Sequence, residues 1–139
     1  MSDLEIPKWL KELPPYRFSI RKKKRKPVIV RAFPRRTRAT PDDSLSFIGF
    51  PTKDVECDEV HISVTFTWDI PLAESMREEW SQVSRVVKMG GPALGSRGGE
   101  FIPGRYLKRG YVITSRGCPN NCWFCSVPKR EGRGVRELK

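Results

Sequence analysis

An alternation of apolar and polar residues over positions 60–68 constrains the fold of this chain more than any other feature. Every second side chain in that stretch is apolar: Val60, Ile62, Val64, Phe66 and Trp68. A period of two residues is typical of a β-strand that buries one face. We therefore expect a half-buried strand here, with these five side chains on its buried face.

A helix and a second strand are predicted directly after it. Asp69 and Pro71 are typical of a helix start. The apolar side chains that follow recur at helical spacing: Leu72, Met76, Trp80 and Val83. The β-branched pair at 86–87 then begins another strand. The order strand, helix, strand predicts a βαβ unit with a parallel sheet, and short apolar runs at 28–30 and 46–50 add two candidate strands to it.

The amino-acid composition of the chain changes after this unit. Residues 90–110 contain seven glycines and two prolines, which is typical of a connection rather than a helix or strand. A further apolar run at 111–114 predicts one more strand, and that strand leads directly into a group of cysteines. We therefore expect a second module to begin at residue 111.

Three cysteines with the spacing C-x3-C-x2-C are the strongest indication of chemistry: Cys118, Cys122 and Cys125. A closed structural metal site takes four protein ligands, whereas a site that does chemistry leaves one position open. Three thiolates on one short loop therefore favour an iron–sulfur cluster with one iron free for a substrate. A structural zinc site would need a fourth ligand from Cys57 or His61, both distant in the sequence. Paired disulfides are disfavoured, because nothing marks the chain as secreted.

At these residues the chain resembles the radical S-adenosylmethionine superfamily, whose cluster loop has this spacing and an aromatic residue, here Phe124, before the third cysteine. The resemblance implies that Cys118, Cys122 and Cys125 each hold one iron of a [4Fe–4S] cluster, and that the fourth iron chelates S-adenosylmethionine. One electron from the cluster would then give methionine and a 5′-deoxyadenosyl radical. It also implies that Phe124 lies beside the adenine, and that flavodoxin or ferredoxin acts as reductant. No protein side chain is assigned as catalytic.

The βαβ unit and the Gly-Gly-Pro at 90–92 resemble the Rossmann-type domain that precedes the barrel in cobalamin-type members of the superfamily. Modules that bind cobalt through histidine use Asp-x-His-x-x-Gly, and His61, the sole histidine, does not lie in that motif. Cobalamin is therefore not expected. His61 is interpreted as a polar position on a strand rather than a ligand or a base.

The expected fold class is α/β, with a small Rossmann-like parallel sheet leading into the first strand of an incomplete (β/α) radical S-adenosylmethionine barrel. The divisions are a basic, flexible extension over 1–27, the Rossmann-like region over 28–95, the Gly-rich connection over 96–110, and the start of the barrel with its cluster loop over 111–139. Only 14 residues follow Cys125. We therefore expect a fragment with little activity alone, or a second chain that completes the barrel.

Charge and hydropathy limit the partners. The net charge is +11, and six consecutive positive side chains occupy residues 21–26. Such a run is typical of a solvated tail, although it also suits contact with nucleic acid phosphates. The alternative function is therefore a basic zinc-binding, nucleic-acid-binding protein without enzymatic activity. No apolar run approaches the roughly 18 residues of a membrane span, and reduced cysteines without an export signal indicate the cytoplasm.

Overall fold

Four parallel strands form the main sheet of the computed structural model, which describes residues 25–96 and 100–137. They are β1 (Ile29–Phe33), β2 (Ser46–Ile48), β3 (Glu59–Ser63) and β4 (Val86–Gly90). Their order across the sheet is β2-β1-β3-β4, and every neighbouring pair is parallel. The chain is thus Rossmann-like α/β, as predicted. The extension at 1–27 lies almost entirely outside the described residues.

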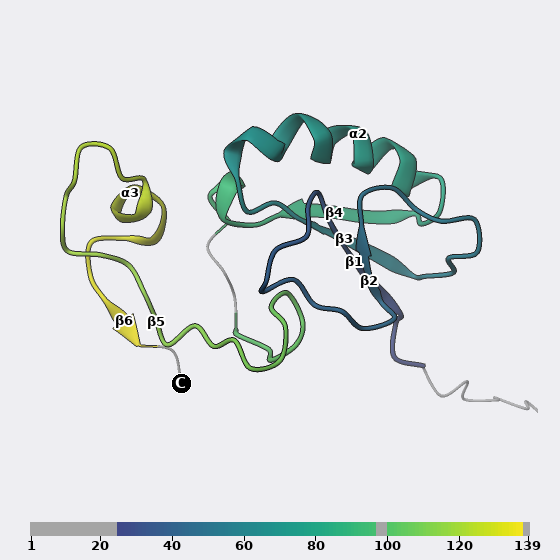
Figure 1. Ribbon diagram of the computed structural model, residues 1–139, viewed down its shortest axis with the longest axis horizontal. Helices are drawn as coiled ribbons and strands as arrows, with labels where there is room; N and C mark the ends of the chain where they lie inside the picture. Colours follow the sequence, from purple (N-terminus) through teal and green to yellow (C-terminus); the bar gives the residue numbers. More distant parts are fainter. Residues whose placement is uncertain (1–24, 97–99, 138–139) are drawn as a thin grey trace, which may run out of the picture.

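Helix α2 (Ile70–Ser81) covers one face of this sheet (Figure 1). The largest fully buried side chains come from α2, from the strand positions that face it and from the residue directly after β3: Trp80, Met76, Ile62, Val30, Val60 and Val64. Complete burial of each such side chain stabilises the fold by about 1.5–3 kcal/mol. The Trp80 indole also donates a hydrogen bond of 3.0 Å to the carbonyl oxygen of Gly49 after β2. The βαβ unit therefore has its hydrophobic core between α2 and the sheet.

Two local predictions in this unit need correction. Strand β3 ends at Ser63, and a 3-10 turn η1 (Thr67–Asp69) follows, so that Trp68 is 65% exposed instead of buried. The physical reason is that β4, its pairing partner, ends at Gly90, opposite Ser63. On α2 the buried face contains Ala73 with Met76 and Trp80, whereas Leu72 is 39% exposed. The buried face of the helix is thus formed by residues 73, 76 and 80, and Leu72 lies outside it.

The second face of the sheet is covered in part by residues 101–108, here called the strap. Arg31 of β1 holds it, donating from Nη1 to the carbonyl oxygens of Gly104 (3.0 Å) and Arg105 (2.9 Å). The amide of Lys108 donates to the carbonyl oxygen of Ala39 at 2.8 Å. The green segment in Figure 1 accordingly runs on the side of the sheet opposite α2. The predicted connection therefore folds back onto the sheet.

A small lobe follows the strap and lies beside the α/β unit, at the yellow end of the chain in Figure 1. It contains β5 (Ser115–Arg116), α3 (Val127–Glu131) and β6 (Arg136–Glu137), and β5 pairs with β6 in antiparallel fashion. The strand predicted at 111–114 is wrong, because these residues form no strand and Val112 is 67% exposed. An isolated apolar run needs a neighbouring strand to pair with, and only residues 115–116 have one here.

None of the helices in the described parts of the chain is long and apolar enough to cross a membrane. This agrees with the hydropathy of the sequence. 

Candidate functional site

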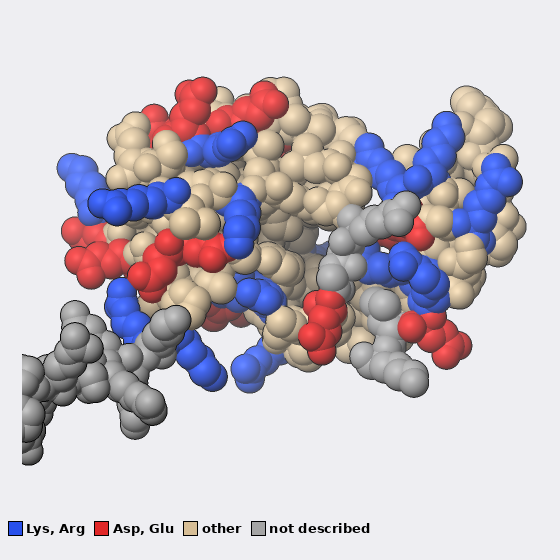
Figure 2. Space-filling model, turned by 180° about the vertical axis from the view of Figure 1, so that it is seen from behind, with Lys and Arg blue, Asp and Glu red and all other residues tan. Residues whose placement is uncertain are grey.

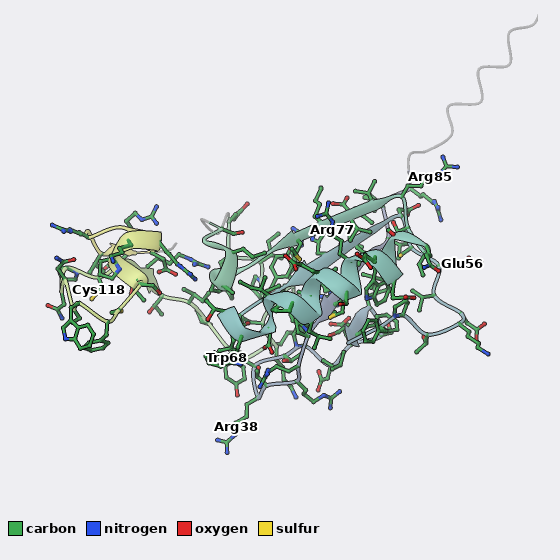
Figure 3. All side chains as sticks on the ribbon, turned by 90° about the horizontal axis from the view of Figure 1, so that it is seen from above. Arg38, Glu56, Trp68, Arg77, Arg85 and Cys118 are labelled. Atoms are coloured by element: carbon green, nitrogen blue, oxygen red, sulfur yellow. The ribbon has the colours of Figure 1, made fainter. Side chains whose placement is uncertain are left out.

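The three predicted ligand cysteines lie on the loop that joins β5 to α3 in the small lobe. Their thiols are free; Cys122 is exposed, and Cys118 and Cys125 are partly buried. Two backbone hydrogen bonds shape the loop, from the Cys118 amide to the Gly132 carbonyl oxygen (3.1 Å) and from the Cys125 amide to the Cys122 carbonyl oxygen (3.2 Å). Figure 3 shows Cys118 in the lobe, away from α2. The loop is thus a separate module from the main hydrophobic core.

Gly117 and Glu131 hold the start of this loop. Gly117 has a φ of +91°, and a Cβ at this position would overlap the carbonyl oxygen of Gly134. The Glu131 carboxylate accepts hydrogen bonds of 3.2 Å from the Gly117 amide and from Nη1 of Arg116. Both contacts connect β5 with the end of α3. The segment before the first cysteine is therefore held in two ways: by the close approach of the Gly117 and Gly134 backbones and by the Glu131 carboxylate.

The described residues contain no group of three or more Cys, His, Asp or Glu side chains arranged to hold a single metal ion. A lone zinc requires its ligands to converge on one atom. Cys57 packs instead against the hydrophobic core, where burial raises the pKa of its thiol. The same finding applies to Cys118, Cys122 and Cys125, which the structure does not gather into such a group. Their thiols are of the chemical type that a [4Fe–4S] cluster takes as ligands.

Two aromatic side chains project from the cysteine loop. Trp123 is 91% exposed and Phe124 is 75% exposed, and their rings meet edge to face with centroids 5.5 Å apart. Phe124, the residue predicted to contact the cofactor, is therefore open to solvent. An exposed aromatic face can stack on a planar ring such as adenine.

The small lobe contacts the α/β unit near the carboxyl end of β4. Arg130 of α3 donates from Nη1 to the carbonyl oxygen of Pro92 at 2.5 Å. A pocket of about 240 Å³ lies between the two parts, with Trp68 and Arg130 among its lining residues. Ligands of doubly wound α/β folds bind outside the carboxyl ends of the parallel strands. The lobe thus borders the edge at which such folds bind ligands.

The Gly-Gly-Pro segment has a structural role at this edge. Gly91 has a φ of +118°, and a Cβ there would overlap the backbone of Val64. The carbonyl oxygen of Val64 accepts a hydrogen bond of 3.0 Å from the amide of Ala93. Only glycine at position 91 permits this close approach of the two backbones. The motif therefore joins the ends of β3 and β4.

A second pocket, of about 390 Å³, was missed by the sequence analysis. It lies on the face of the sheet opposite α2 and includes His61, Lys88 and Tyr106 in its lining. His61 does lie on strand β3, as predicted, yet both of its ring nitrogens have side-chain partners. Tyr106 is 45 residues away in the sequence, so no local pattern signals this contact.

Comparisons with family models, curated proteins and solved structures found no match to this chain.

Proposed function

We propose that residues 118–125 bind a [4Fe–4S] cluster, and that the protein is a radical S-adenosylmethionine enzyme. The observation that carries this proposal is the C-x3-C-x2-C spacing with Phe124 before the last cysteine. Such a cluster, when bound, supplies one electron to the sulfonium of S-adenosylmethionine. The thiolates of Cys118, Cys122 and Cys125 are its protein ligands, and the missing fourth thiolate leaves room for the substrate.

The other residues of the loop have positioning roles in this proposal. Phe124 stacks on the adenine, and its 75% exposure supports that role. Glu131 and Gly117 hold the first cysteine in place through the contacts between β5 and α3. Neither Cys57 nor His61 is included, and cobalamin is not part of the proposal. A reductant such as flavodoxin or ferredoxin is the expected partner.

The exposure of the loop implies that something covers it during the reaction. Radical chemistry requires that water and oxygen be kept from the reacting atoms. Trp123 at 91% and Phe124 at 75% exposure leave the loop open in this structure. We therefore propose that a further barrel segment or a second chain encloses the loop when S-adenosylmethionine is bound.

The test is anaerobic reconstitution with ferrous iron and sulfide, followed by measurement of iron and sulfide per chain. We expect a brown protein, and we expect that Cys118→Ala, Cys122→Ala or Cys125→Ala each abolishes cluster assembly. Cys57→Ala is the matched control, because it removes the one cysteine outside the loop; it should bind as much iron as the native chain. Unchanged iron in the variant that lacks all three loop cysteines would refute the proposal.

The alternative, a zinc-containing nucleic-acid-binding protein, is supported by the charge of the strap and the small lobe together. Residues 101–139 contain nine Lys or Arg and two Asp or Glu. Figure 2 shows basic side chains gathered on this lobe. A colourless protein that retains stoichiometric zinc after the same reconstitution, and whose affinity for nucleic acid falls steeply with salt, would favour this alternative.

A further inference from the structure

The pocket on the open face of the sheet has the size of a small-molecule site. Its volume is about 390 Å³, which is within the range of roughly 300–1,000 Å³ for ligand pockets. Strands β3 and β4 form its floor, the strap forms one wall, and Ile113 and Arg116 border it from the approach to the small lobe. None of the cysteines lines this pocket, and Arg116, two residues before Cys118, is where it meets the proposed cluster loop.

A chain of hydrogen bonds forms the polar side of this pocket. The Glu59 carboxylate lies 2.6 Å from Nε2 of His61 and also pairs with Lys88 on β4. The other ring nitrogen of His61, Nδ1, lies 2.5 Å from the hydroxyl of Tyr106 on the strap. A carboxylate only accepts hydrogen bonds, so Nε2 of His61 must carry a proton. In the neutral imidazole Nδ1 then accepts from Tyr106, and the Tyr106 ring is held against His61 with centroids 5.9 Å apart.

The groups that face the pocket are hydrogen-bond donors rather than acids. The cations Lys88 and Arg116 and the hydroxyls of Ser63, Thr65 and Ser96 line it, and no Asp or Glu among the described residues does. The balancing carboxylates, Glu59 and Glu131, each pair with one of the two cations from outside the lining. Lys88 keeps further N–H donors, with a side chain that is 65% exposed. The pocket therefore offers charged donors to a ligand.

The remaining wall is apolar. Leu107 of the strap and Ile113 contribute to it. Ligand sites commonly combine such apolar surface with a few placed polar groups that fix the orientation of the ligand. A matching ligand has an apolar body and one anionic group.

We propose that this pocket binds a small organic anion. The anion is a carboxylate or a phosphate ester attached to an apolar group about the size of one aromatic ring. The anionic group lies near the Lys88 ammonium group, and the ring contacts Leu107 and Ile113. Glu59 and His61 are positioning residues, because they hold Lys88 and Tyr106 without facing the ligand's charge directly.

The test is a titration of the metal-free, isotope-labelled full chain, followed by NMR. The probes are benzoate and phenyl phosphate as anions, benzamide as the neutral analogue, and benzylammonium as the cation. His61 is the sole histidine, so its imidazole signals are unambiguous reporters. We expect saturable shifts of these signals with at least one anion, at about tenfold higher affinity than with benzamide, which is the effect of one charge-assisted hydrogen bond. Which anion binds more tightly distinguishes a carboxylate site from a phosphate site.

Three variants make the test specific. Lys88→Gln should weaken anion binding about tenfold, whereas Tyr106→Phe, which keeps the ring, should change it little, because the hydroxyl already donates its one proton to His61. Lys108→Gln is the matched control, because Lys108 forms an ion pair with Asp42 outside this pocket; it should bind as the native chain does. The proposal would be overturned by equal affinity for benzylammonium and benzoate, or by full affinity for anions in Lys88→Gln. It would also be overturned if the anions left the His61 signals unshifted, or if they shifted only signals of residues 129–136 in the small lobe.

Discussion

Gly117 shows how a single residue sets the geometry of the cysteine loop. Its φ of +91° is in a region that side chains other than glycine rarely adopt, and the carbonyl oxygen of Gly134 occupies the space of a Cβ. We expect Gly117→Ala to destabilise the β5–β6 pairing by about 1–3 kcal/mol from backbone strain alone, with the overlap adding to this. Faster hydrogen exchange at the Cys118 amide, which is bonded to Gly132, measures the effect.

A second glycine separates strain from overlap in that experiment. Gly110 has a φ of +99°, yet in the described parts of the chain no heavy atom beyond its two neighbours lies within 4 Å of its Cβ position. Gly110→Ala should therefore show strain only, and it should leave exchange at Cys118 unchanged. If both variants alter the Cys118 amide equally, the close approach of Gly134 does not hold the loop.

At the scale of the element, helix α2 shows which side chains face the sheet. Met76 is fully buried, whereas Leu72 is 39% exposed. We expect Met76→Ala to lower the free energy of unfolding by about 2–5 kcal/mol, since it leaves a cavity in the core, and Leu72→Ala by about 0.5 kcal/mol or less, as for other surface changes. Urea denaturation of both variants measures this. Equal losses would mean that the helix presents the face predicted from its periodicity instead.

At the scale of the whole molecule, Glu59 connects three segments that are distant in the sequence. Its carboxylate pairs with Lys88 on β4 and with His61, which in turn holds Tyr106 on the strap. Hydrogen bonds from Lys88 and then from His61 lower the pKa of Glu59 below its ordinary value. The folded state therefore binds this proton less readily than the unfolded state does. Its stabilisation is present above the unfolded pKa of about 4.3 and is lost as the pH falls through the folded value.

The pH dependence of stability tests this connection. We expect Glu59→Gln to lower the free energy of unfolding at pH 7, and we expect the difference from the native chain to shrink as the pH falls from about 5 to below the ordinary glutamate value of about 4.3. Chemical denaturation at several pH values measures it. Glu56→Gln is the control, because Glu56 is an exposed carboxylate at the far end of the unit (Figure 3). A pH-independent difference would show that Glu59 contributes through packing rather than charge.

The sequence by itself determined the elements whose signals are local. The alternation over 60–64, the helix start near Asp69 and the β-branched pair at 86–87 predict the β3, α2 and β4 order that the structure contains. These signals suffice because the apolar side chains on the buried face of a strand or helix recur every few residues along the sequence. The cysteine spacing is local in the same sense, and the cluster it indicates stays a prediction.

Only the tertiary structure decided the contacts between distant segments. Arg31 meets the strap 73 residues later, and His61 meets Tyr106 45 residues later. The same holds for the place of Ala73 on the buried face of α2 and for the absence of a strand at 111–114. These residues gain their hydrogen-bond partners and their buried surface only once the sheet has formed. No periodic pattern in the local sequence therefore predicts these contacts. The donor-lined pocket arises from such contacts, and it could not be predicted from the sequence for that reason.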